Sequence, residues 1–416
     1  MTIGVIGGGA WGTALAQVLA SGGEDVCLWA RENDVITSIR ERRENTIFLP
    51  GVQLSERIRP VSDVGESAAQ DVVLVVAPAQ HLRSVIVQIP KQEQHLILCT
   101  KGIESGSRKF MHEVAGEAEL ATGGGIAVLS GPTFAHEVAA GLPTAITLAC
   151  EDAALGEVLA KRIARPHFRP YLTDDVAGAE VGGAVKNVLA IACGVVEGQG
   201  LGQNARAALI ARGFAEMTRF GLARGARAET LAGLSGLGDL VLTCSSTQSR
   251  NFSLGKGLGE GKSARALMAD RLTVAEGAST APVLQQAARS AGVDMPVVDA
   301  VCALLKTTYW ANDRPRDVIA KSLQHSICFA LLHEGRQIGI CRGVTDHSTF
   351  TWIADVVVAD DHRGHGLGKW MMKCLLSHPD LQTISYHLCT KDAHELYEPF
   401  GFQRIEAMRR SSRPPF

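Results

Sequence analysis

The chain has 416 residues, of which 46% are hydrophobic and 20% are charged, and its formal net charge is −2. A chain of this length is usually too long to fold around a single hydrophobic core, so we expect two or three ordinary globular domains. The near-neutral charge removes the electrostatic case for nucleic acid or an anionic membrane as a partner, and the longest apolar runs, such as 72–78, are too short to span a bilayer.

The first predicted element is an apolar strand at 3–6, which leads directly into Gly7-x-Gly9-x-x-Gly12, a helical stretch and a second strand at 25–29. This order is typical of a Rossmann-type dinucleotide-binding unit. Gly7 permits the tight turn, Gly9 lets the backbone approach a pyrophosphate, and Gly12 lets the helix pack closely on the sheet. An isolated match also fits a plain glycine-rich turn, but the flanking strand and helix favour the cofactor. We expect NAD(H) or NADP(H) to contact Gly7, Gly9, Ala10, Trp11 and Gly12.

The end of the second strand bears on the choice of cofactor. NAD sites place an acidic residue there for the ribose hydroxyls, whereas NADP sites place an arginine for the 2′-phosphate. The sequence offers both, because Arg31 is followed by Glu32. Arg31 favours NADP, Glu32 keeps NAD open, and a solvated turn is the alternative interpretation of Arg31.

Strands and helices alternate as far as about residue 175, which is the pattern of a doubly wound parallel sheet. Helical spacing then takes over, and no strand pattern returns until about residue 327. We therefore predict an α/β protein with a Rossmann-type domain at 1–177, an all-helical substrate domain at 178–305 and an α+β domain at 306–416. The further strands of the first domain are expected at 71–76, 95–100, 125–130 and 143–150.

Four further motifs follow the glycine loop in a fixed order. They are Lys101-Gly102-Ile103, Gly131-Pro132-Thr133-Phe134-Ala135, GGAVKN with Lys186, and GLGDL…SRNF with Asp239, Ser249, Arg250 and Asn251. With these motifs the chain resembles, over about residues 1–305, the NAD(P)-dependent glycerol-3-phosphate dehydrogenases of bacteria. The resemblance implies the reduction of dihydroxyacetone phosphate to sn-glycerol 3-phosphate, a precursor of phospholipid headgroups, by a homodimer.

Lys186 is the candidate catalytic residue. Hydride transfer to a ketone leaves negative charge developing on oxygen, so a positioned proton donor is required. Lys186 lies one helical turn from Gly182 and Ala190, small residues that we expect to leave room for a substrate; an exposed surface lysine is the alternative. Reduction is the easier direction, because deprotonating a lysine of pKa about 10.4 at neutral pH costs on the order of 4 kcal/mol.

The SRN triplet is the candidate phosphate site. Arg250 and Asn251 beside Ser249 offer a charge and an amide to a phosphate, although the triplet alone also fits a solvated turn. By resemblance, Arg250 also contacts the cofactor and Asp239 lies near Lys186. The resemblance places Lys101, Gly131 and Thr133 on the substrate side, with Lys101 also reaching the cofactor, and Ala135, Val274 and Glu276 on the nicotinamide or ribose side.

In the third domain, strands are expected at 327–332, 337–344, 350–358 and 384–389. The third strand leads into Arg363-Gly364-His365-Gly366-Leu367-Gly368 and a helix, an arrangement whose backbone amides suit a diphosphate. Together with Leu396-Tyr397-Glu398, it resembles the acetyl-CoA pyrophosphate loop of the GNAT acetyltransferase superfamily. The resemblance implies acetyl-CoA at Arg363, Gly364, Gly366 and Gly368, with Tyr397 protonating the departing thiolate; a packing role for Tyr397 is the alternative.

The cysteines and histidines predict no metal site. The ten cysteines are scattered without a CxxC pair, and His362 with His365 has no third ligand at suitable spacing. We expect reduced thiols, no signal peptide before the first strand, and a cytoplasmic protein. Two alternatives to the leading function are a related 3-hydroxyacid or sugar-acid dehydrogenase and a non-catalytic module that senses nucleotide and acyl-CoA levels.

Overall fold

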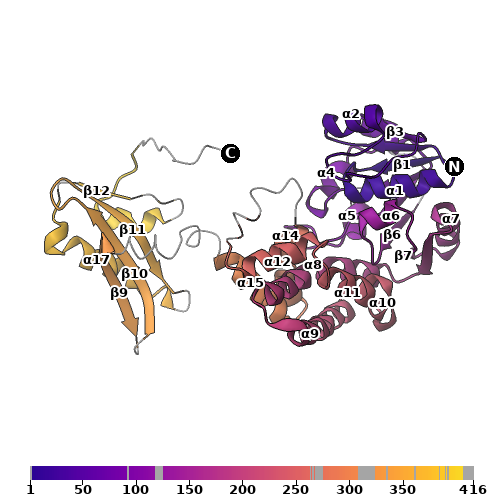
Figure 1. Ribbon diagram of the computed structural model, residues 1–416. Coiled ribbons are helices and arrows are strands. Elements are labelled where there is room, and N and C mark those ends of the chain that lie inside the picture. Colours follow the sequence, from indigo (N-terminus) through magenta and orange to yellow (C-terminus); the bar gives the residue numbers. More distant parts are fainter. Residues whose placement is uncertain are drawn as a thin grey trace. The chain divides into compact units, whose positions relative to one another are not determined.

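The computed structural model describes residues 2–90, 93–117, 125–262, 264, 267, 275–307, 324–333, 336–359, 362–383, 385–388, 390 and 393–405. The chain forms two compact units, Met1–Asp313 and Arg314–Phe416. Figure 1 shows a sheet flanked by helices and a group of helices in the first unit, and a smaller sheet with its own helices in the second.

The first unit is built on an eight-stranded sheet with the order β3-β2-β1-β4-β5-β6-β7-β8. All neighbouring pairs are parallel except β6 and β7, which are antiparallel. The sequence pattern predicted a parallel sheet, and β7 and β8 depart from it by running opposite to the other six strands, because strand and helix alternation does not determine direction. The strands are β1 (Ile3–Ile6), β2 (Val26–Trp29), β3 (Ile58–Val61), β4 (Val72–Val75), β5 (His95–Leu98), β6 (Ile126–Ser130), β7 (Thr144–Ala149) and β8 (Phe168–Thr173).

Both faces of this sheet are buried at its central strands. Val72 and Leu74 of β4 belong to one apolar cluster, whereas Val73 and Val75 belong to another, as the two-residue period of a strand requires. The doubly wound arrangement is therefore confirmed. The helices of this part are α1 (Ala10–Ser21), α2 (Asn33–Arg42), α3 (Val64–Ala68), η1 (Ala79–His81), α4 (Leu82–Ile86), α5 (Met111–Glu117), α6 (Ala135–Ala139) and α7 (Ala153–Ile163).

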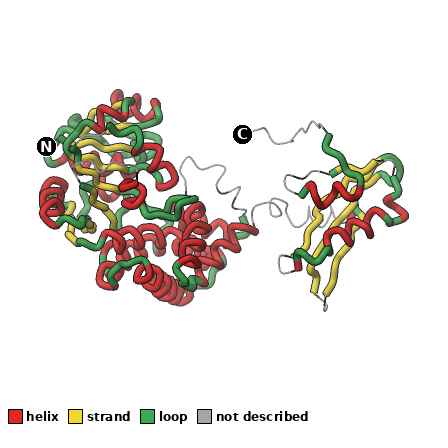
Figure 2. Tube along the Cα trace, turned by 180° about the vertical axis from the view of Figure 1, so that it is seen from behind, coloured by secondary structure: helices red, strands yellow, loops and turns green. Residues whose placement is uncertain are grey.

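Where the structure describes residues 176–307, they contain helices and the loops between them but no strand, as predicted. Figure 2 shows the helices of this part in red and the loops in green. Its centre is the 23-residue helix α8 (Val176–Gly198), which contacts β6 and β7 of the sheet as well as its helical neighbours. By length and composition α8 could cross a membrane, but 89% of its most apolar stretch is buried inside the protein. The other elements are α9 (Gly202–Ala223), α10 (Ala228–Ala232), the π-helical turn η2 (Leu234–Gly238), α11 (Asp239–Cys244), α12 (Arg250–Gly259), α14 (Glu276–Ser290) and α15 (Pro296–Thr307).

The second unit is a four-stranded sheet with the order β12-β11-β10-β9, antiparallel except for the parallel pair of β11 and β12. Helix α17 lies against β10 and β11 and shares an apolar core with them that includes Cys341, Ile353 and Met372. Its elements are β9 (Ile327–His333), β10 (Arg336–Thr345), β11 (Phe350–Val358), α17 (Leu367–Leu376), η4 (Pro379–Leu381), β12 (Ser385–His387), α18 (His394–Tyr397) and η5 (Glu398–Phe400). The four strands expected from sequence are thus present.

Candidate functional site

The glycine loop between β1 and α1 has three different steric environments. Gly7 has φ +129°, a conformation that L side chains rarely adopt, and a Cβ there would lie 2.8 Å from the Val76 carbonyl oxygen. A Cβ on Gly12 would lie 1.9 Å from the carbonyl oxygen of Gly7, whereas a Cβ on Gly9 would meet nothing within 4 Å. Gly7 and Gly12 therefore allow a close turn, and Gly9 faces the open space that a pyrophosphate needs.

Helix α1 starts beside this open space and suits an anion. Its first turn, which includes Ala10 and Trp11, contains no acidic residue, so no side chain of that turn offsets the positive end of the helix dipole. The indole nitrogen of Trp11 is buried and has no hydrogen-bond partner among the described residues. Ala135 begins α6, which packs against α1. These features fit a dinucleotide.

At the end of β2, Arg31 and Glu32 form an exposed ion pair at 2.9 Å. Arg31, which favours NADP, and Glu32, which is compatible with NAD, therefore also bind each other through their side chains. A surface pair of this kind contributes little to stability, so the Arg31 guanidinium can exchange its partner for a 2′-phosphate at small cost.

A cluster of two lysines and one aspartate lies between the sheet and the helices, with Lys186 and Asp239 buried and Lys101 partly exposed. The Lys186 amine on α8 donates to Asp239 Oδ1 at 2.6 Å, and the Lys101 amine donates to Asp239 Oδ2 at 2.8 Å. Asp239 begins α11 and is fully buried, while Lys186 is only 6% exposed. One carboxylate thus serves two ammonium groups, which gives the cluster a net positive charge that suits an anionic substrate.

Thr243 is a further member of this cluster that sequence reasoning missed. Its hydroxyl accepts a hydrogen bond from the Lys186 amine at 3.1 Å and donates to Asp239 Oδ1 at 3.3 Å. It lies one turn after Asp239 on α11, so the i, i+4 spacing of two polar residues in an apolar helix was the available signal.

Burial lowers the pKa of Lys186 to about 8, and the positive charge of Lys101 acts in the same direction, whereas Asp239 opposes the shift. Forming the free amine near neutral pH then costs on the order of 1 kcal/mol. The cost of about 4 kcal/mol expected from an ordinary lysine is therefore too high, since that value ignored burial.

The small residues near Lys186 serve packing. A Cβ on Gly182 would lie 2.1 Å from the Ser235 carbonyl oxygen, and one on Gly183 would lie 3.1 Å from the Lys101 side chain. The expectation that they leave room for a substrate is wrong for Gly182, because η2 fills that space. The substrate-side residues expected at the end of β6 do gather here: the Gly131 carbonyl accepts hydrogen bonds from Lys101 at 3.0 Å and from the Thr133 hydroxyl at 3.3 Å.

The SRN triplet forms the start of α12, and its polar side chains have partners within the protein. The Ser249 hydroxyl caps the helix by accepting from the Phe252 N–H at 3.2 Å, and Asn251 Oδ1 accepts from the Gly277 N–H at 2.9 Å. Burial raises the pKa of Glu276, an effect that the positive charges of Arg250, Lys101 and Lys186 oppose. Glu276 therefore lies in the field of the lysine cluster and of Arg250. The predicted contact Val274 lies outside the described residues.

In the second unit, the predicted diphosphate loop leads into α17. Gly364 and Gly366 have φ values of +83° and +76° and face open space, while a Cβ on Gly368 would contact Leu396 at 3.5 Å. Arg363 Nε donates to the Val358 carbonyl at 3.0 Å, which ties the loop to the end of β11. Tyr397 is 9% exposed, lies in the apolar core and contacts the Phe402 ring edge-on, so its ring packs; its role as a proton donor stays a prediction.

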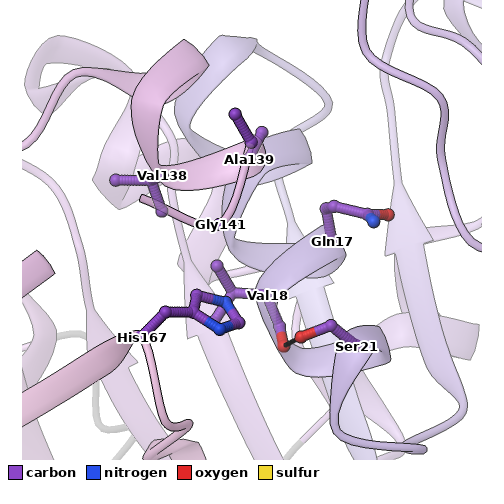
Figure 3. A pocket seen from close by; sticks show the side chains of 8 residues that line it. Gln17, Val18, Ser21, Val138, Ala139, Gly141 and His167 are labelled. Atoms are coloured by element: carbon purple, nitrogen blue, oxygen red, sulfur yellow. Dashed lines mark hydrogen bonds between the residues drawn. The ribbon is translucent and has the colours of Figure 1, made fainter. Parts of the chain in front are cut away.

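A pocket of about 230 Å³ lies elsewhere in the first unit, between the outer part of α1, the segment around α6 and His167 (Figure 3). Gln17, Val18 and Ser21 of α1 line one side of it. It contains none of the predicted site residues, and His167 is its one titratable side chain, so it offers no general acid and base pair.

Comparison with known proteins agrees with this geometry. Residues 2–156 match the family model described as NAD-dependent glycerol-3-phosphate dehydrogenase N-terminus, and residues 175–314 match the model of its C-terminus. A glycerol-3-phosphate dehydrogenase [NAD(P)+] of Erythrobacter litoralis is 64% identical over 299 residues, 72% of this chain and 90% of the relative. The chain belongs to the NAD(P)-dependent glycerol-3-phosphate dehydrogenase family. A second relative with the same description, from Novosphingobium aromaticivorans, is 63% identical over 77% of this chain and 97% of its own length.

Solved structures of this family have the same fold as the first unit. The glycerol-3-phosphate dehydrogenase of Coxiella burnetii superposes with a TM-score of 0.70 at 37% identity, covering 78% of this chain and 98% of that chain. The enzyme of Saccharomyces cerevisiae gives a TM-score of 0.63 at 28% identity, covering 77% and 98%. Residues 324–404 match the model of the acetyltransferase (GNAT) domain, so the chain joins a member of the dehydrogenase family to a GNAT domain.

Proposed function

We propose that this chain catalyses the NAD(P)H-dependent reduction of dihydroxyacetone phosphate to sn-glycerol 3-phosphate for glycerophospholipid synthesis. The observation that carries the proposal is the buried Lys186 amine, held by Asp239 at 2.6 Å beside the second ammonium group of Lys101. The dinucleotide supplies the hydride when it is bound. Lys186 donates its proton to the ketone oxygen, and Asp239 and Thr243 orient that amine.

We propose domain boundaries at 1–177, 178–305 and 306–416. The remaining site residues are proposed as substrate contacts or as cofactor contacts. Arg250 and Asn251 hold the phosphate with help from the positive field of Lys101. The proposed substrate contacts are Lys101, Gly131, Thr133, Lys186, Asp239, Ser249, Arg250 and Asn251. The proposed cofactor contacts are Gly7, Gly9, Ala10, Trp11, Gly12, Arg31, Lys101, Ala135, Arg250, Val274 and Glu276. We also propose that the protein is a cytoplasmic homodimer.

A steady-state assay with dihydroxyacetone phosphate tests this function. The full chain should consume NADPH only when the ketone phosphate is present, and it should not accept 3-hydroxyacids or sugar acids in the reverse direction. A sensing module would bind NADPH and consume none. Consumption with an unphosphorylated hydroxyacid and none with the ketone phosphate would replace the proposal by the alternative dehydrogenase.

The pH dependence of turnover should follow Lys186, whose pKa is about 8. Reduction needs the ammonium form, so kcat/KM for the ketone phosphate should be level at lower pH and fall about tenfold per pH unit above 8. Oxidation of glycerol 3-phosphate needs the free amine, so its kcat/KM should rise with pH up to about 8 and be level above that. Initial rates in both directions between pH 6 and 10 measure this, and parallel profiles for the two directions would contradict it.

Arg31 should set the preference for NADPH over NADH. Arg31→Ala removes the charged partner of the 2′-phosphate and should raise KM for NADPH about tenfold to a hundredfold, with little change for NADH. The matched control is Arg57→Ala, since Arg57 is also an exposed arginine of this domain paired with an acid, Asp25, at 3.0 Å. An equal rise in KM for both cofactors would exclude the proposed phosphate contact.

For the GNAT domain we propose acetyl-CoA binding at Arg363, Gly364, Gly366 and Gly368, with Tyr397 as the proton donor to the thiolate. The support is the pair of glycines with positive φ that face open space at the start of α17. Titration of the full chain with acetyl-CoA, compared with Gly366→Val, tests the site, because a side chain there would be strained and would occupy the loop. Equal binding by both proteins would contradict it.

A further inference from the structure

Asn45 is a fully buried residue that joins the segment after α2 to the glycine loop. Its amide nitrogen donates to the Gly8 carbonyl oxygen at 2.8 Å and to the Thr13 hydroxyl at 2.9 Å. Its amide oxygen accepts from the Phe48 N–H at 3.1 Å, so each end of the amide has a defined partner. Thr13 in turn donates to the same Gly8 carbonyl at 3.4 Å. Two side chains thus converge on one backbone oxygen.

The direction of that oxygen determines the direction of the next amide. The Gly8 carbonyl and the Gly9 N–H belong to one peptide group, and no cis peptide bond occurs in the described chain. In a planar trans peptide the C=O and N–H bonds point in opposite directions. Since Asn45 holds the carbonyl inward, the Gly9 N–H must point outward, away from Asn45. A Cβ built on Gly9 would meet nothing within 4 Å, so this part of the loop has free space around it.

We propose that Asn45 is a positioning residue for the dinucleotide, which holds the Gly8–Gly9 peptide so that the Gly9 N–H faces the pyrophosphate. The proposal rests on the proposed NAD(P)H-dependent activity. A glycine loop is free to rotate its peptides, and an amide facing inward would present a carbonyl oxygen to the phosphate instead of a donor. Asn45 removes that alternative before the cofactor arrives.

Fluorescence titration with NADPH in the absence of substrate tests the proposal on the full chain. Asn45→Ala and Asn45→Asp should each raise the Kd of NADPH about tenfold to a hundredfold, because both lose the donors to Gly8. Asn45→Asp keeps the acceptor for the Phe48 N–H, so it removes only the donor side of the amide. KM for NADPH should rise in parallel, while kcat at saturating NADPH and KM for the ketone phosphate should stay within about twofold of wild type.

The matched control is Ser67→Ala. The Ser67 hydroxyl is likewise fully buried and bonds two backbone carbonyls, of Val5 and Cys27, on β1 and β2. It should lower thermal stability without changing the Kd of NADPH. Should the Asn45 variants fail to fold, Thr13→Val, which removes the second donor to Gly8, should still raise the Kd.

Two results would overturn the proposal. The first is an unchanged Kd of NADPH in folded Asn45 variants or, if these do not fold, in Thr13→Val. The second is an equal rise in the Kd of NADPH in Ser67→Ala and in the Asn45 variants, which would indicate general destabilisation. Wild-type protein that does not bind NADPH at all would instead contradict the proposed function, so the two failures are distinguishable.

Discussion

Replacing Lys186 with alanine is expected to lower kcat for ketone reduction by about 10²–10⁴-fold while NADPH still binds. The amine is the buried proton donor of the site, and Lys101 cannot stand in for it, because Lys101 is bound to Gly131 and Asp239 on the other side of the carboxylate. The glycine loop makes no contact with Lys186 in the described hydrogen-bond network, so cofactor affinity should persist. Loss of NADPH absorbance and a parallel fluorescence titration measure the two effects.

A second variant separates chemistry from packing. Lys186→Met keeps most of the side-chain volume and removes only the charge, so it should lose as much activity as Lys186→Ala with less loss of stability. Thr243→Val removes the second partner of the amine and should have a smaller effect. Turnover retained in Lys186→Met would remove Lys186 from the mechanism.

Replacing Asp239 with asparagine is expected to lower the free energy of unfolding of the dehydrogenase part by about 3–5 kcal/mol. The substitution keeps the size of the side chain but leaves the ammonium groups of Lys101 and Lys186 close together without their counter-charge. Scanning calorimetry of the full chain measures the loss. Because Asp239 raises the pKa of Lys186 in the native protein, the variant should also shift the pH profile of reduction to lower pH.

The matched control is Asp174→Asn. Asp174 also pairs with a basic residue, Arg227, but both side chains are at least half exposed, so the loss of stability should be small beside that of Asp239→Asn. Equal stability of wild type and Asp239→Asn, or an unshifted pH profile, would mean that Asp239 does not act as the counter-charge of the two lysines.

The sequence predicted the central strands of the first unit and missed the two outer ones. β1, β4 and residues 96–98 of β5 are continuous apolar runs because both of their faces are buried. β3 and β8 form the two edges of the sheet, and each contains a proline, Pro60 and Pro170, that interrupts the strand pattern. Proline is tolerated there because an edge strand has one side without ladder hydrogen bonds. The prolines that prevented the prediction of β3 and β8 are thus tolerated because these strands lie at the edges of the sheet.

Site residues that belong to a family motif could be predicted from the sequence. Those whose role depends on contacts between residues far apart in the chain could not. Lys186, Lys101 and Asp239 were found because their motifs resemble those of a known family. Asn45 gave no such signal, since an asparagine after a helix is ordinary loop composition. The lowered pKa of Lys186 likewise follows from burial and from a neighbour 85 positions earlier in the chain, which no local pattern contains.

The central helix of the first unit has a consequence for modularity. The boundary drawn from sequence, 177/178, falls in the first turn of α8, which begins at Val176. Just beyond it, Glu180 accepts the N–H of His112 at 3.0 Å, so the start of the helix is fastened to the sheet layer while its remainder forms the core of the other layer. A chimera or a split protein joined at this boundary would cut a helix that both layers share and expose a long apolar surface to water.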